Sequence, residues 1–279
     1  MNAFLVAPLA LVALGALAGW FLPKVAGPAT CAWVLTLAAV IGATGLTAAL
    51  LSLSLAAVSE TGDLPSALGW CHHFSAGLGR AMSWVGAGAA LVLLFATAKT
   101  MRFLRHLRRD LSAFAHVDGV EIVTADGPVA FAVPGRPGGV VLGDQLLERL
   151  ESVERRVVLA HERAHLDLHH HRFVRTAELC AAAFPILRPL ARQVRFNCER
   201  WADEVAVTSI GSSPGAPAVA LPFSGLGAAA RVDALLHPGP RRGPAMSMSA
   251  ASATILLTLT GSSVQLHHLA SFAVHLCPS

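Results

Sequence analysis

The chain has 279 residues, of which 54% are hydrophobic and only 14% are charged. Soluble domains average about 25% charged residues, so this composition argues against an ordinary soluble enzyme and predicts a membrane protein in contact with lipid. The formal net charge is +4. A run of five basic residues adjoins an apolar run, as in an anchor on anionic lipid, and we expect no direct binding of nucleic acid.

The first hundred residues contain three apolar runs, at about 4–22, 31–58 and 82–98. Each run is long enough, or nearly so, to cross a bilayer core of about 30 Å. We therefore predict three transmembrane helices within residues 1–100. A cleaved signal peptide is the alternative for the first run, but no Lys or Arg precedes that run to form the charged start of such a signal.

A fourth apolar stretch, residues 250–274, contains Ser, Thr and two histidines and has a weaker hydropathy signal. We predict that it forms a fourth transmembrane helix within residues 246–279, followed by a short external tail. Orientation follows from charge, because five basic residues come directly after the third run and positive residues favour the cytoplasmic side. The N-terminus is then predicted to lie outside the cell membrane and residues 101–245 in the cytoplasm.

The predicted cytoplasmic segment begins with short β-branched runs at 120–123, 129–133 and 140–142, separated by the turn sequences ADG and PGRPGG. This pattern predicts a small antiparallel sheet. From about Ser152 onward the pattern becomes helical. The fold class predicted for the chain is a multi-pass α-helical membrane protein with an inserted small α+β domain.

The sequence HERAH at residues 161–165 carries the main chemical signal. His161 and His165 are four residues apart, so on a helix they share one face, about 6 Å apart along the axis, and both imidazoles can reach one zinc ion. Glu162 follows the first histidine directly, where its carboxylate can act as a base toward water at the metal. The motif predicts one Zn²⁺ ion per chain and a zinc metalloendopeptidase.

A zinc site of this kind needs a third protein ligand. His169 lies about 12 Å along the helix axis from His161, too far for both to bind one ion on a straight helix. His171 fits the spacing HExxHxxGxxH, but Leu168 stands at the glycine position. We therefore predict that the helix continues through Leu168, that His171 turns to another face, and that residues 169–171 form a polar helix end without a catalytic role.

The sequence NCERWADEVAV offers the third ligand on a later helix. Glu199 and Asp203 are again four residues apart, so one carboxylate can bind the metal while the other orients a ligand imidazole. We expect Glu199 to be the ligand and Asp203 the orienting group, with Glu204 as the competing ligand. Residues 175–195, just before them, are interrupted by charges and a proline, which favours an amphipathic helix on the core or the inner leaflet over another span.

These motifs resemble those of the M56 family of membrane metallopeptidases, the family of the β-lactam sensor-transducers. The resemblance rests on AHERAHLDLHHHRF, the later ERWAD, the preceding VAFAVPGRPGGVVLGDQLLERL and the array of predicted spans. That family is related to the gluzincins of the CAAX prenyl protease and HtpX type. The resemblance implies a cytoplasmic gluzincin domain between the third and fourth spans, and it implies the same roles for the same five residues.

In the antibiotic-sensing members of that family, activation leads to cleavage of a cytoplasmic repressor. The resemblance therefore implies proteolysis of a cytoplasmic regulator, such as a BlaI/MecI-like repressor. Those sensors carry a large external penicillin-binding domain after the fourth span, which this sequence lacks, so we do not expect this chain alone to sense β-lactams.

Two other functions remain as hypotheses. One is quality control of membrane proteins by an HtpX-like protease, which broad cleavage of misfolded substrates would support. The other is a non-catalytic, zinc-stabilised membrane signalling protein. Glu162 argues against the second, because a purely structural zinc site has no need of a base.

Overall fold

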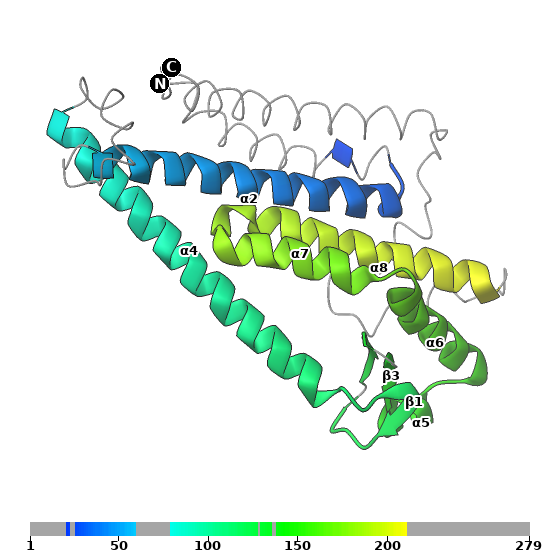
Figure 1. Ribbon diagram of the computed structural model, residues 1–279. Helices are drawn as coiled ribbons and strands as arrows, with labels where there is room; N and C mark the ends of the chain where they lie inside the picture. Colours follow the sequence, from blue (N-terminus) through cyan, green and yellow to red (C-terminus); the bar gives the residue numbers. More distant parts are fainter. Residues whose placement is uncertain (1–20, 23–25, 60–78, 128, 136–137, 211–279) are drawn as a thin grey trace, which may run out of the picture.

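The computed structural model describes residues 21–22, 26–59, 79–127, 129–135 and 138–210. This part of the chain is mostly helical, with one small three-stranded sheet (Figure 1). Nearly all of the first predicted span and the whole of the fourth lie outside the described residues.

The two longest helices are α2, Pro28–Ser59, and α4, Gly79–Ala113. Within the described residues, these are the two helices whose length and composition would allow them to cross a membrane, over Pro28–Leu55 and Trp84–Ala113. They correspond to the second and third predicted spans. Helix α4 does not end near residue 98, but continues through the basic sequence KTMRFLRHLRRD.

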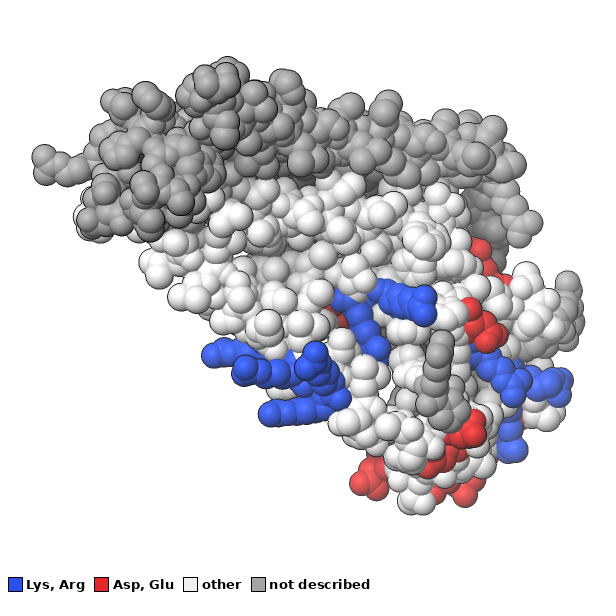
Figure 2. All heavy atoms as spheres, viewed as in Figure 1, with Lys and Arg blue, Asp and Glu red and all other residues white. Residues whose placement is uncertain are grey.

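The two halves of α4 carry different side chains. The first half exposes large apolar residues, among them Trp84 at 79% and Leu94 at 68% exposure. The second half carries Lys99 and four arginines. In Figure 2 the Lys and Arg side chains lie in the lower part of the view, below an uncharged surface. An apolar surface followed by basic residues suggests a membrane location, because basic residues are enriched at cytoplasmic helix ends.

Helices α2 and α4 pack together at Gly86, where α4 has no side chain. A Cβ atom at this position would overlap the Cβ of Ala57 and lie 2.6 Å from the carbonyl oxygen of Leu53. Small residues allow two helix backbones to approach closely. From this crossing α4 diverges from α2 and runs toward the sheet (Figure 1).

The sheet consists of β1, Asp118–Val123, β2, Ala130–Val133, and β3, Gly138–Gly143. The strand order is β1-β3-β2, with β2 antiparallel and β1 parallel to β3. The predicted antiparallel pairing is correct for β2 and β3 but wrong for β1, so the sheet is mixed. The reason is that β3 inserts between β1 and β2, which leaves β2 as an edge strand against α6.

Four helices and one short 3-10 helix follow the sheet, in the order α5, Asp144–Arg149; α6, Ser152–Asp167; α7, His170–Ala183; η3, Pro185–Leu187; and α8, Arg188–Ile210. Helix α6 begins at Ser152, as predicted. Its start is fixed by a capping box, in which the side chains of Glu151 and Glu154 each accept a hydrogen bond from the other's backbone N–H group.

The helix that carries HERAH does not continue through Leu168, so that prediction is wrong. Helix α6 ends at Asp167, and His169 adopts a left-handed conformation with φ of 54°. Histidine is one of the non-glycine residues that are enriched in this region of backbone space, so the chain can break here without a glycine. Helix α7 then begins at His170 as a separate element (Figure 1).

Residues 175–195 form parts of two helices rather than one. Helix α7 ends at Ala183, and Pro185, which lacks a backbone N–H donor, begins η3 before α8 starts. Helices α7 and α8 pack on each other and on α2 (Figure 1). The shared core contains the buried residues Cys31, Leu35, Phe173, Ala177, Leu190 and Val194. The segment therefore rests on the protein core, and this packing fixes α8 beside α6.

Candidate metal centre

The candidate site lies where α6 packs against α8. On α6, the side chains of His161 and His165 point into the same space, with their Nε2 atoms 3.1 Å apart. His161 is buried and His165 is half-buried. Their proximity follows from the four-residue spacing on a regular helix, as the sequence predicted.

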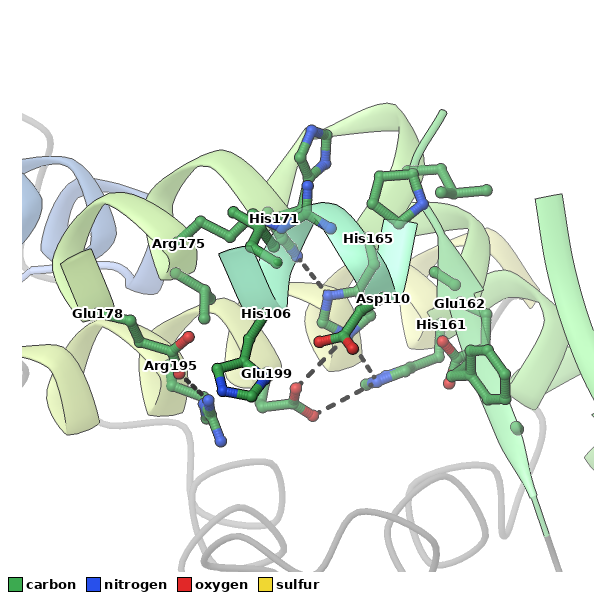
Figure 3. A pocket seen from close by; sticks show the side chains of 18 of the residues that line it. His106, Asp110, His161, Glu162, His165, His171, Arg175, Glu178, Arg195 and Glu199 are labelled. Carbon is green, nitrogen blue, oxygen red and sulfur yellow. Dashed lines mark hydrogen bonds and ion pairs between the residues drawn. The ribbon is translucent and has the colours of Figure 1, made fainter. Parts of the chain in front are cut away.

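Helix α8 brings Glu199 to the two histidines (Figure 3). Its Oε2 atom lies 3.6 Å from Nε2 of His161, and its Oε1 atom lies 3.7 Å from Nε2 of His165. One possible ligand atom from each of the three residues lies within 4.8 Å of the others. Glu204, the competing carboxylate, is exposed and outside this group.

Asp203 lies one turn after Glu199 on α8 and is 1% exposed. Its Oδ1 atom is 3.0 Å from Nδ1 of His161, the ring nitrogen that faces away from Glu199. Burial opposes protonation of His161, but the hydrogen bonds to Asp203 and Glu199 outweigh it, and the pKa of His161 rises to about 9. The two carboxylates thus favour a positive charge here, either a proton on His161 or a bound cation.

Glu162 lines the same cavity as the His/His/Glu group (Figure 3). The cavity has a volume of about 590 Å³ and is bounded by α6, α7, α8, strand β2 and the C-terminal part of α4. Glu162 is half-buried and lines the space in which a reactant would lie. His161, Glu162, His165 and Glu199 thus line one cavity, and Asp203 lies behind His161.

Several charged cavity residues were not singled out from the sequence. Glu178 of α7 forms an ion pair with Arg195 of α8, and Arg175 and Asp110 also line the space. Asp110 comes from α4, whereas the other three residues come from the later helices α7 and α8. Their proximity depends on how α4 approaches the α7 and α8 pair, and no local sequence pattern encodes that.

The three histidines after the motif have three different environments. His169 forms the break between α6 and α7. His170 is 1% exposed, and its Nδ1 atom lies 3.0 Å from Nδ1 of His165. His171 lines the cavity but lies outside the group of candidate ligands. His170 and His171 begin α7 rather than end α6, and His170 is buried, so the prediction of a polar helix end is wrong.

The donor atoms fit a zinc ion. Two ligands bound at about 2.1 Å in a tetrahedral arrangement are about 3.4 Å apart. The two Nε2 atoms are 3.1 Å apart, and they lie 3.6 and 3.7 Å from different carboxylate oxygens of Glu199, which is close to this value. Two imidazoles and one carboxylate are also a ligand set of catalytic zinc sites, which leave a fourth position for water or substrate.

Comparison with known proteins agrees with this geometry. Residues 98–224 match the model of peptidase family M48. The matched stretch begins within α4, includes the sheet and α5 to α8, and extends beyond the described residues. Searches among curated proteins and among solved structures gave no match.

The M48 match supports a gluzincin-type metallopeptidase, and together with the His/His/Glu group it indicates a zinc metallopeptidase. Membrane association is suggested by the two long apolar helices. The narrower resemblance to the M56 family stays a prediction.

Proposed function

We propose that this protein is an integral membrane zinc metalloendopeptidase that cleaves a peptide bond of a cytoplasmic protein. The observation that carries the proposal is the convergence of His161, His165 and Glu199 within 4.8 Å on a cavity that Glu162 also lines. A structural zinc site would be closed by a fourth protein ligand. The described residues around this group instead provide three ligands and an adjacent carboxylate.

In this proposal His161, His165 and Glu199 hold the metal, and Asp203 fixes the His161 ring through Nδ1. When bound, zinc supplies Lewis-acid chemistry that polarises the scissile carbonyl and makes water more acidic. Glu162 accepts a proton from the attacking water while the water oxygen bonds to the carbonyl carbon. Glu162 then donates that proton to the leaving nitrogen as the carbon–nitrogen bond breaks.

Strand β2 is proposed to bind the substrate. It is an edge strand, and its residues 130–132 line the cavity beside α6. An extended peptide can add to such an edge through backbone hydrogen bonds. The developing negative charge on the carbonyl oxygen needs a donor besides the metal. The chain contains no tyrosine, so a histidine, an arginine or a backbone N–H group must provide it.

The cellular role rests on resemblance. We propose a multi-pass protein with an external N-terminus and a cytoplasmic protease domain, of the M56 type, that cleaves a transcriptional repressor in a signalling pathway. The basic end of α4 supports the assignment of residues after it to the cytoplasmic side. HtpX-like quality control is the alternative, and it predicts cleavage of many unfolded membrane proteins rather than one regulator.

The decisive test compares the wild-type protein with Glu162→Gln during co-expression with candidate repressors. Glutamine keeps the shape of the side chain but cannot accept the proton, so cleavage should fall by at least about 100-fold while zinc content stays unchanged. Cleavage by both proteins at the same rate would contradict the proposed mechanism. Cleavage of many unrelated membrane proteins by the wild type would favour the quality-control function.

A further inference from the structure

His170 lies directly behind the second histidine of the proposed metal site, and this inference rests on the function proposed above. The Nε2 atom of His165 faces His161 and Glu199, at 3.1 and 3.7 Å. Its other ring nitrogen, Nδ1, lies 3.0 Å from Nδ1 of His170. The imidazole of His165 is thus held between the group of candidate ligands on one side and a buried histidine on the other.

The chemistry of a metal-binding imidazole sets the direction of this hydrogen bond. When Nε2 of His165 binds a metal, the neutral ring carries its proton on Nδ1 and can only donate there. His170 must then accept through Nδ1 and carry its own proton on Nε2. A neutral His170 satisfies this requirement, whereas a protonated His170 would have two N–H donors and no acceptor.

The packing of His170 restricts its ring to this position. The side chain is 1% exposed, and its ring centroid lies 4.9 Å from those of both His165 and Trp201. The planes of the two histidine rings are 83° apart, so the edge of one ring meets the other. The left-handed backbone of His169 ends α6 and starts α7, which places His170 at the back of the site.

Histidine is an unfavourable residue at a buried position where the side chain only fills space, because its ring nitrogens need hydrogen-bond partners. Nε2 of His170 is buried and has no hydrogen-bond partner within the described part of the chain. An unpaired buried donor destabilises a protein, and an apolar side chain would avoid this. The hydrogen bond to His165 is the interaction in the structure that an apolar residue could not make.

We propose that His170 is a positioning residue that holds His165 in the tautomer and orientation required for metal binding through Nε2. The two histidine ligands are then supported differently. Nδ1 of His161 lies 3.0 Å from a carboxylate oxygen of Asp203, whereas Nδ1 of His165 lies 3.0 Å from a ring nitrogen of His170, which is neutral in this proposal. A carboxylate makes an imidazole ligand more basic than a neutral acceptor does, so His165 is the weaker donor to the metal.

The test measures zinc affinity of the full-length protein in detergent micelles, by competition with a chromophoric chelator. His170→Ala should weaken zinc binding by about 10–100-fold, the usual effect of removing a group that orients a metal ligand. His170→Asn should recover most of the affinity, because its side-chain oxygen can accept the same hydrogen bond. His171→Ala is the matched control, a neighbouring histidine of α7 outside the ligand group, and should bind zinc like the wild type.

A second readout separates positioning from packing. In the cobalt-loaded protein, the visible absorption spectrum reports ligand geometry, and it should change in His170→Ala but return toward the wild type in His170→Asn. Circular dichroism of the metal-free variants checks that they keep the helix content of the wild type. The proposal is overturned if His170→Ala binds zinc as tightly as the wild type, or if His170→Asn is as weak as His170→Ala.

These outcomes are distinct from failure of the proposed function. If the wild-type protein binds no zinc, both the peptidase proposal and the role of His170 fall together. If the wild type binds zinc but His170 has no effect, only the positioning role is lost. Loss of cleavage in Glu162→Gln with normal zinc affinity would leave the His170 result unaffected.

Discussion

His161 and His170 are buried imidazoles that respond to their surroundings in opposite ways. His161 has two carboxylates nearby, and the hydrogen bonds to them outweigh its burial, so its pKa rises to about 9. His170 is buried next to other histidines. Burial is the main cause that lowers its pKa, and the neighbouring His165 lowers it further, to about 3. One ring is thus protonated at neutral pH in the metal-free protein, while the other is neutral.

This contrast predicts how the stability of the metal-free protein depends on pH. The folded-state pKa of His161 lies above its unfolded value of 6.5, so its contribution is complete below pH 6.5 and is lost as the pH rises toward 9. The folded-state pKa of His170 lies below 6.5, so its contribution is lost as the pH falls below 6.5. Stability should therefore be greatest near pH 6.5.

Thermal unfolding in the presence of a chelator, at pH 5, 6.5 and 9, would check this expectation. Asp203→Asn provides the control, because it removes one cause of the raised His161 pKa and should flatten the decrease between pH 6.5 and 9. A melting temperature that rises steadily from pH 6.5 to 9 would contradict the assignment. Zinc should reverse the alkaline trend, since a bound imidazole must be deprotonated at the ligand nitrogen.

Individual residues were predictable where the helix period alone decides their placement. The facing of His161 and His165, and of Glu199 and Asp203, follows from a spacing of four residues. The left-handed conformation of His169 was not predictable in the same way. Leu168 favours helix continuation by its propensity, but the chain breaks beside it, where α7 turns back to bury Phe173 and Ala177 against α2. Tertiary packing overrides local preference at this position, and it also buries His170.

Among the elements, the crossing of α2 and α4 depends on one missing side chain. Gly86→Ala would place a methyl group against Ala57 and the backbone of Leu53, so the helices would have to separate. We expect a loss of about 1–3 kcal/mol of stability, which is typical of overpacking. Gly88→Ala is the matched control on the same helix, because a Cβ atom there meets nothing within 4 Å.

Denaturation of both variants in detergent micelles would measure this difference. The control should be neutral or slightly more stable than the wild type, since alanine favours a helix over glycine by up to about 1 kcal/mol. Equal stability of the two variants would mean that α2 and α4 do not approach closely at Gly86.

Strands and helices were predicted more successfully than their pairing. The positions of β1, β2 and β3 correspond to the β-branched runs of the sequence, and the β2–β3 hairpin follows from the turn between them. The parallel pairing of β1 with β3 was missed because consecutive short strands usually form hairpins. The buried run Val140–Leu142 was the available signal, since a strand buried on both faces suits the centre of a sheet.

At the scale of the whole molecule, the candidate site depends on contacts between distant segments. Helices α7 and α8 pack on α2, one of the two apolar helices, and α8 in turn holds Glu199 and Asp203 against α6. The sequence identified the residues on each helix, but it could not specify that α2 supports this arrangement. Periodicity defines which face of a helix is apolar, whereas the choice of its partner depends on the complete fold.

Metal removal should therefore affect the stability of the assembled helices. The proposed ligands connect α6, through His161 and His165, to α8, through Glu199. A ligand that binds only the folded state stabilises it by about 2.7 kcal/mol when its free concentration is 100 times its dissociation constant. Zinc should accordingly raise the melting temperature of the metal-free protein, whereas Mg²⁺ should not, because imidazole ligands favour zinc.

In Glu199→Ala the connection to α8 is removed, so most of the zinc-dependent increase should disappear even if the two histidines still bind the ion weakly. An increase of the same size in Glu199→Ala and in the wild type would mean that the third ligand lies elsewhere, and that zinc does not join α6 to α8.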